Sequence, residues 1–275
     1  MAATYYRQSA AAYEALGDEQ RAAQQQANGA AVAIEYGPEP AQGLRDVQNA
    51  LAVFRKLGDK NFEVFCLQLI AAQQRFAGRH DEAQRTLNQA LAISRERNLT
   101  HRIAPLTLDI AKSLIETGDD TGAKKDLLEA LGDGSGPATS EIRLYLARAA
   151  VGLHDFAGAR EQLDVAARDI ESHGDENLAP LLHETRGELA YASGNLVEAR
   201  RHFGTASALW VDDTPDAASV QARAYLGLLD GLAGKLDTGL ATLRQSLDQA
   251  RRMQRAVIER RIEDFKARVA PRARR

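Results

Sequence analysis

Small and large apolar residues recur along this chain at intervals of 36 to 40 residues. In each interval a small residue is followed four positions later by a larger apolar residue, and three positions after that by another small one. Spacings of four and three place these residues on one face of an α-helix. The six starting positions are Gly43, Ala83, Ala123, Ala159, Ala199 and Gly239. The pattern predicts six copies of a helix that packs through a single apolar face.

A second set of small residues lies twelve positions before these starting points. Its members are Ala31, Ala71, Ala111, Ala147, Gly187 and Gly227. A helix that crosses its partner closely needs a residue without bulk at the crossing. Glycines such as Gly78 and Gly194 stand between the two sets, where a residue with positive φ ends a helix. Each interval is therefore expected to form a hairpin of two antiparallel helices.

The segment Gly78–Leu91, with Ala83, Leu87 and Ala90 in phase, resembles the second-helix signature of the tetratricopeptide repeat (TPR) family. The resemblance extends over residues 24–250 as six units, and it implies an all-α, right-handed superhelical solenoid of helix hairpins. The 40-residue interval exceeds the 34 residues usual in the family. It is similar to the long-helix variants of bacterial regulators and signalling scaffolds. His154 departs from the pattern by replacing the turn glycine of the fourth unit.

The two ends of the chain fall outside the six units. Extrapolating the interval backwards assigns residues 1–23 to an incomplete N-terminal repeat helix. Repeat arrays normally end in atypical caps, so we expect either a piece of a longer protein or an array without a conventional N-terminal cap. Self-association through this helix would cover its apolar face. Residues 251–275 are predicted to form a C-terminal helix followed by a basic tail.

The net charge and its distribution limit the classes of molecule that the chain is expected to bind. The net charge of −3 argues against a surface that binds nucleic acid throughout. Residues 251–275, however, contain ten Arg/Lys and three Asp/Glu, a local charge of +7. We favour a solubilising end to the array, and contact with nucleic acid, an anionic membrane surface or an acidic protein is the alternative. No apolar stretch approaches the roughly 20 residues that span a bilayer, and no leader is evident, so a cytoplasmic protein is expected.

A search for catalytic patterns supports a non-enzymatic protein without metal or cofactor. Residues 118–125 lack the spacing of a phosphate-binding loop, and the glycine-rich residues 131–137 suggest a flexible connection. The pairs Asp119–Asp120 and Asp212–Asp213 fit helix caps. Cys66 is expected to be a buried thiol. No two histidines have the i, i+4 spacing of a helical metal site, and the six are interpreted as mostly solvated.

The TPR resemblance implies that the first helices of successive units line a concave groove. Nine residues fall in the groove-facing phase: Gln25, Asn28, Gln68, Arg75, Lys112, Arg148, Glu184, Glu188 and Tyr191. The groove is predicted to be basic in its middle and acidic towards its C-terminal part. A basic middle suits an extended or helical peptide that carries acidic residues.

The function that these features favour is a protein- or peptide-binding scaffold, acting as the interaction or sensor region of a larger bacterial regulatory protein. The alternative is a small-molecule or signal-peptide sensor that changes its superhelical pitch on binding. The sequence does not identify the ligand.

Overall fold

The computed structural model describes residues 2–35, 40–132, 138–209 and 217–270, and every regular element among them is helical. The chain forms two compact units, Met1–Ser113 and Leu114–Arg275, here called the N-terminal and C-terminal units. Three predictions lie outside the described residues: the caps at Asp212–Asp213, most of the glycine-rich connection, and the tail from Pro271.

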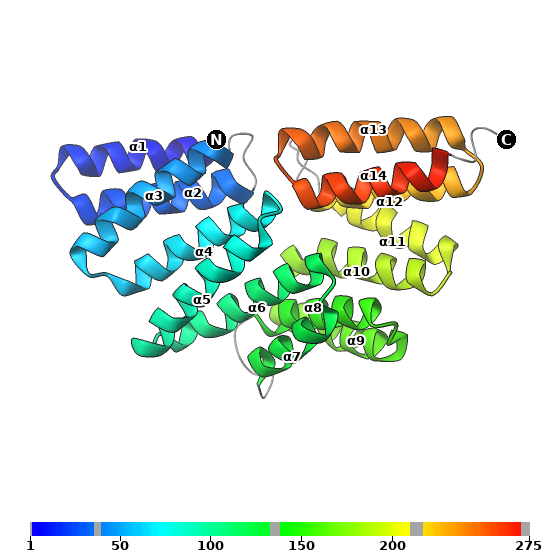
Figure 1. Cartoon of the computed structure of the whole chain (residues 1–275), viewed down its shortest axis with the longest axis horizontal. Coiled ribbons are helices and arrows are strands. Elements are labelled where there is room, and N and C mark those ends of the chain that lie inside the picture. The colour runs from blue at the N-terminus through cyan, green and yellow to red at the C-terminus, as the bar shows by residue number, and fades with distance from the viewer. Residues whose placement is uncertain (1, 36–39, 133–137, 210–216, 271–275) are drawn as a thin grey trace. The chain divides into compact units, whose positions relative to one another are not determined.

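The N-terminal unit contains helices in antiparallel succession (Figure 1). They are α1 (Ala2–Ala15), α2 (Glu19–Glu35), α3 (Pro40–Leu57), α4 (Lys60–Phe76), α5 (His80–Glu96) and most of α6 (Thr100–Thr117). The closely packed pairs are α2 with α3 and α4 with α5, and α1 packs on α2 to a similar extent. This pairing confirms the predicted hairpins in this unit.

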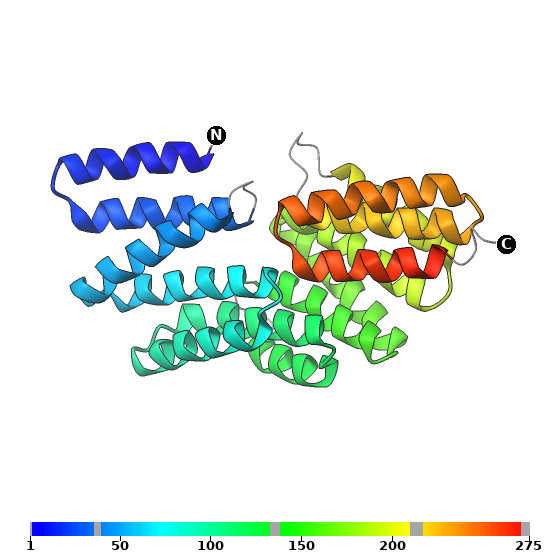
Figure 2. The ribbon, with the colours of Figure 1, turned by 45° about the horizontal axis from the view of Figure 1, so that its top comes forward.

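The C-terminal unit continues the pattern to the end of the described chain. It contains α7 (Asp120–Leu131), α8 (Thr139–Gly152), α9 (Phe156–His173), a 3₁₀ turn (Glu176–Leu178), α10 (Ala179–Ala192), α11 (Leu196–Leu209), α12 (Ala217–Leu232), α13 (Leu236–Arg252) and α14 (Ala256–Val269). Hairpins form between α8 and α9, α10 and α11, and α12 and α13. Figure 2 shows α14 beside α13 and α12, where the first helix of a further hairpin would pack.

The repeating apolar positions form the core of the second helices. Each of the six starting residues is the fourth residue of its helix, and each is buried. The larger residues four positions later are at most 2% exposed; they are Val47, Leu87, Leu127, Leu163, Phe203 and Leu243. The predicted apolar face is therefore confirmed. Ala130 is the exception among the following small residues, because it is partly exposed near the end of the short helix α7.

Five of the six small residues predicted at the crossings of the first helices are buried. Ala31 is the exception, because it is partly exposed while its neighbour Ala30 is fully buried. A Cβ atom added to Gly43 would lie 3.1 Å from the carbonyl oxygen of Ala30 and 3.0 Å from side-chain atoms of Ala33 and Ile34. The close approach between α2 and α3 therefore falls one position earlier than the twelve-residue spacing predicts.

The turns inside the hairpins have the predicted left-handed backbone. Gly78, Gly118, Gly194 and Gly234 have φ between 76° and 87°. His154 occupies the corresponding position between α8 and α9 with φ of 58°. Left-handed backbone costs a residue with a Cβ atom about 1–2 kcal/mol, so the fourth hairpin tolerates local strain that glycine relieves in the four turns named above.

We expect replacement of His154 by glycine to raise the free energy of unfolding by about 0.5–1 kcal/mol. Relief of the left-handed strain exceeds the entropy that glycine adds to the unfolded chain. Urea denaturation of the variant measures the difference. Asn98→Gly is the control, because Asn98 has φ of 54° and asparagine tolerates this conformation better; its gain should be smaller. A loss of stability in His154→Gly would mean that the edge contact between His154 and Phe156 outweighs the strain.

Candidate binding surface

All nine predicted binding residues lie on the even-numbered helices, here called the first helices. Eight of them are partly exposed, whereas Glu184 is buried. They are distributed as Gln25 and Asn28 on α2, Gln68 and Arg75 on α4, Lys112 on α6, Arg148 on α8, and Glu184, Glu188 and Tyr191 on α10. The contacts of these side chains differ between the two units.

In the N-terminal unit, side chains one repeat apart bind each other across successive first helices. Gln68 Nε2 donates a hydrogen bond to Oδ2 of Asp109, at 2.6 Å. Lys112 Nζ lies 3.3 Å from Oδ1 of the same carboxylate. Arg102 Nε donates to Oδ1 of Asn61, at 3.0 Å. Because these interhelical pairs are 41 residues apart, the repeat itself brings the polar groups together.

Two candidates on α2 retain free hydrogen-bonding capacity. Gln25 and Asn28 are partly exposed, and neither side chain has a hydrogen bond to another residue that the structure describes. Their spacing of three places them on one face of the helix. Each amide can donate and accept hydrogen bonds. Arg75, unlike these two amides, already has a side-chain contact, because its guanidinium lies 4.6 Å from the centre of the Phe76 ring.

In the C-terminal unit, five side chains from four first helices form a buried charge cluster: Arg148, Glu184, Glu188, Gln221 and Arg261. Oε1 of Glu188 is its centre, 2.8 Å from Arg148 Nη2 and 3.4 Å from Arg261 Nη1. Glu184 Oε1 lies 3.5 Å from Arg148 Nη2 and accepts a hydrogen bond from Gln221 Nε2. The Arg148 and Glu184 side chains are only 12% and 3% exposed. The cluster therefore joins α8, α10, α12 and α14 largely away from water.

Burial and charge pairing compete inside the cluster. Burial raises the pKa of Glu184 to about 7, although the neighbouring Arg148 opposes the rise. Burial acts to lower the pKa of Arg148, but Glu188 and Glu184 more than offset it and the pKa is raised. Arg148 is therefore always charged. At neutral pH, Glu184 is poised between its charged and uncharged forms.

Aromatic rings border the cluster. The Tyr225 ring stacks on Phe203 with 4.2 Å between centroids, and burial raises the pKa of its phenol. Tyr191 packs edge-on against Tyr225 at 5.8 Å, and the guanidinium of Arg268 lies 5.5 Å from the Tyr191 ring centre. Arg268 and Arg261 both belong to α14, so this helix contacts α10 through two side chains.

These contacts change the prediction of separate basic and acidic regions. Arg148, expected in a basic middle, and the two glutamates, expected in an acidic part, are neighbours in one cluster. Lys112 is likewise paired with a carboxylate. A ligand carboxylate at Arg148 must therefore compete with Glu188 for the same guanidinium.

Gln221, Tyr225 and Arg261 are not among the nine predicted residues, because the predicted groove positions end at Tyr191. A signal was present, since Arg261 lies 40 residues after Gln221.

The interpretation of the histidines as solvated is wrong for His202, which is 6% exposed. Cys66 is buried as predicted, and burial raises the pKa of its thiol to about 12, so it stays protonated. Asp119 caps α7 as predicted by accepting from the Gly122 amide.

Within the described ranges, no helix has the length and apolar character that crossing a membrane requires. Nor do three or more His, Cys, Asp or Glu side chains gather there in a metal-binding arrangement.

Solved structures with the same fold place the chain among TPR-like repeat proteins. No family model and no curated protein sequence matches it. A Rap protein complexed with Competence and Sporulation Factor aligns over 94% of this chain and 78% of its own, with a TM-score of 0.69 and 12% identity. NprR in complex with its cognate peptide NprX aligns over 84% of this chain and 69% of its own, with a TM-score of 0.66 and 12% identity.

The apo form of RapI gives a TM-score of 0.64 at 14% identity, over 92% of this chain and 99% of its own. A tetratricopeptide repeat protein from Parabacteroides merdae gives 0.54 at 12% identity, over 94% and 99%. These identities are too low to transfer a function. The chain is a TPR-like repeat protein whose fold is similar to that of the Rap and NprR bacterial regulators.

Proposed function

We propose that the chain is a non-catalytic, peptide-binding module whose ligand lies along the first helices. The observation that carries the proposal is the pair of partly exposed amides at Gln25 and Asn28, which have no side-chain hydrogen bond among the described residues. Amide side chains on one helix face match the alternating donors and acceptors of an extended peptide backbone. The fold similarity to NprR bound to its peptide NprX supports the same class of ligand.

The remaining polar groups of the first helices suit this role by holding the surface in shape. Side chains such as Gln68 and Arg148 are already bound to partners one repeat away. A surface that is ordered before the ligand arrives loses less conformational entropy on binding. We further propose that the module serves as the sensor or interaction region of a larger cytoplasmic regulator, and that acidic residues in the peptide are secondary to backbone recognition.

An array of short unstructured peptides that differ only in their number of acidic residues tests the proposal. The double variant Gln25→Ala/Asn28→Ala is expected to weaken binding of the best peptide by about tenfold or more, because each lost hydrogen bond contributes about 1 kcal/mol. Fluorescence anisotropy with the labelled peptide measures the change.

The control is Asn88→Ala/Gln89→Ala, which removes two exposed amides from the second helix α5 of the same unit. It should bind the peptide as the unaltered chain does. Equal weakening by both double variants would exclude α2 as the contact surface. If no peptide in the array binds the unaltered chain, the peptide-binding proposal is wrong for ligands of this length.

A further inference from the structure

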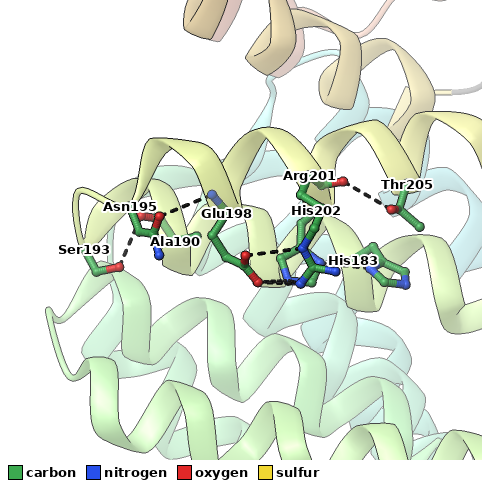
Figure 3. Close-up of polar contacts among 8 residues, drawn as sticks. All are labelled: His183, Ala190, Ser193, Asn195, Glu198, Arg201, His202 and Thr205. Carbon is green, nitrogen blue, oxygen red and sulfur yellow. Dashed lines mark hydrogen bonds and ion pairs between the residues drawn. The ribbon is translucent and has the colours of Figure 1, made fainter.

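Two histidines face each other across one hairpin of the C-terminal unit. His183 on α10 and His202 on α11 have their Nδ1 atoms 3.0 Å apart and their ring centroids 5.2 Å apart (Figure 3). His202 is buried, and His183 is half-buried. At this distance a hydrogen on one Nδ1 atom is donated to the lone pair of the other. The hydrogen bond therefore requires that one of the two Nδ1 atoms carries no hydrogen.

The preceding hairpin has a different pair at the same two positions of the repeat. Arg143 on α8 and Gln162 on α9 lie 40 residues before His183 and His202. Arg143 Nη1 donates a hydrogen bond to Oε1 of Gln162, at 3.3 Å. Neither of these two side chains gains or loses a proton between pH 5 and pH 8. The α10–α11 hairpin therefore has a titratable hydrogen bond where its neighbour has one that does not depend on pH.

The outer nitrogen of His202 also has a contact. Arg201 Nη2 lies 3.1 Å from Nε2 of His202 and, as a guanidinium nitrogen, can only donate to it. The neutral His202 ring then carries its hydrogen on Nδ1 and donates it to His183. One added proton displaces the bond from Arg201, after which Nε2 can donate to Oε1 of Glu198, 3.2 Å away (Figure 3). A second added proton would place a hydrogen on both Nδ1 atoms and break the bond between the rings.

We propose that the bond between His183 and His202 is a pH-sensitive contact, which joins α10 to α11 at neutral pH and breaks when both imidazoles are protonated. Acidification then loosens the α10–α11 hairpin, whereas the α8–α9 hairpin keeps its hydrogen bond. Because α10 also carries Glu188, the centre of the charge cluster, loosening of α10 weakens the contacts of the cluster with α8 and α14.

Burial and nearby charges favour the neutral form of both rings. Burial lowers the pKa of both imidazoles, and the guanidinium groups of Arg201 on α11 and Arg186 on α10 lower it further. Glu198 on α11 partly opposes the shift at His202. Since the folded pKa lies below the ordinary value of 6.5, the stability that the pair contributes is complete above about pH 6.5 and is lost as pH falls below it.

The number of bound protons determines the size of the effect. Two free imidazoles bind two protons below their ordinary pKa, whereas the closed pair can accept only one. Each pH unit of acidification in that range therefore favours the open form by about tenfold. Hydrogen exchange of the full chain at pH 7.5 and pH 5.0 measures the change as protection factors of the α10 and α11 amides.

The double variant His183→Arg/His202→Gln supplies the comparison, since it copies the pair of the preceding hairpin. Relative to this variant, the α10 and α11 amides of the unaltered chain should lose protection by about tenfold or more from pH 7.5 to pH 5.0. The comparison also cancels the opposite contribution of Glu184, which stabilises the chain as pH falls. His173→Gln, at an exposed end of α9, should keep the full pH dependence.

Circular dichroism establishes that each variant is folded. Should the double variant unfold, His183→Gln decides the question, because its amide oxygen can accept a hydrogen bond from a protonated His202, and the pH dependence should be smaller than in the unaltered chain. An equal change of protection in the unaltered chain and in the folded variant would overturn the proposal.

Discussion

Replacing Glu188 by glutamine should lower the free energy of unfolding by about 3 kcal/mol. Oε1 of Glu188 is within 3.4 Å of both Arg148 and Arg261, and removing one partner of a buried ion pair typically costs about 3–5 kcal/mol. Glutamine keeps the shape and one acceptor oxygen, which places the expected loss at the lower end. Urea denaturation at pH 8 measures it.

Glu184→Gln is the matched comparison, one turn away on the same helix. Burial has already raised the pKa of Glu184 to about 7 from an ordinary value of 4.5, so this environment gains little from its charge. Removing this charge should therefore cost no stability at pH 8, and Glu184→Gln should be at least as stable as the unaltered chain. Comparable losses in the two variants would show that Glu188 is not the centre of the cluster.

The raised pKa of Glu184 also determines the direction in which the stability of the fold changes with pH. Between pH 4.5 and about 7 the unfolded carboxyl loses its proton while the folded one keeps it. The contribution of this group to stability is therefore complete below pH 4.5 and is lost as pH rises to about 7. Glutamine does not titrate, so the Glu184→Gln variant lacks this loss of stability. The stability of the variant relative to the unaltered chain should therefore increase from pH 5 to pH 8. A decrease over that range would contradict the raised pKa.

Gly239→Ala is expected to destabilise the chain by about 1–3 kcal/mol through the addition of one methyl group. A Cβ atom there would lie 2.6 Å from the carbonyl oxygen of Gly227 and 2.7 Å from the amide nitrogen of Gly231. Both atoms belong to the backbone of α12, so relief requires α12 and α13 to move apart. Overpacking of this kind typically costs about 1–3 kcal/mol.

Gly204→Ala supplies the control for helix propensity. Gly204 also lies inside a second helix, α11, but a Cβ atom added there would meet nothing within 4 Å. Alanine should therefore stabilise the chain by about 0.5–1 kcal/mol at this position. Thermal unfolding of both variants distinguishes the effects. A gain in stability for Gly239→Ala would mean that α12 and α13 can move apart without a loss of packing.

Much of the fold follows from local patterns in the sequence. The four- and three-residue spacings predict helices because an apolar helix face repeats with that period, and Ala83 and Leu87 are buried accordingly. Turn glycines were predictable for a similar reason, since positive φ favours residues without a Cβ atom. The exact point at which α2 and α3 cross was not predictable. Residues 30 and 31 are both alanine, so the pattern of small residues does not distinguish Ala30 from Ala31.

Which helices carry the candidate residues was predictable, but the contacts of their side chains were not. Helical phase placed Arg148 and Glu188 on first helices, yet charge alone does not distinguish a residue that awaits a ligand from one already paired. Their ion pair depends on the distance between α8 and α10, which sequence spacing does not give. His202 was missed because imidazole is about as common inside proteins as outside, so its burial depends on the packing of α10 against α11.

The contacts of α14 with α10 extend cooperativity beyond neighbouring repeats. In an array where each repeat contacts only the next, the terminal helix opens alone and at low free energy. Arg261 contacts Glu188 at a separation of 73 residues, and Arg268 reaches Tyr191 on the same helix. Fraying of α14 would therefore leave part of the Glu188 charge unmatched two repeats away. We therefore expect this end of the array to open as a block from α10 to α14, with the amides of α14 protected from hydrogen exchange like those of an interior helix.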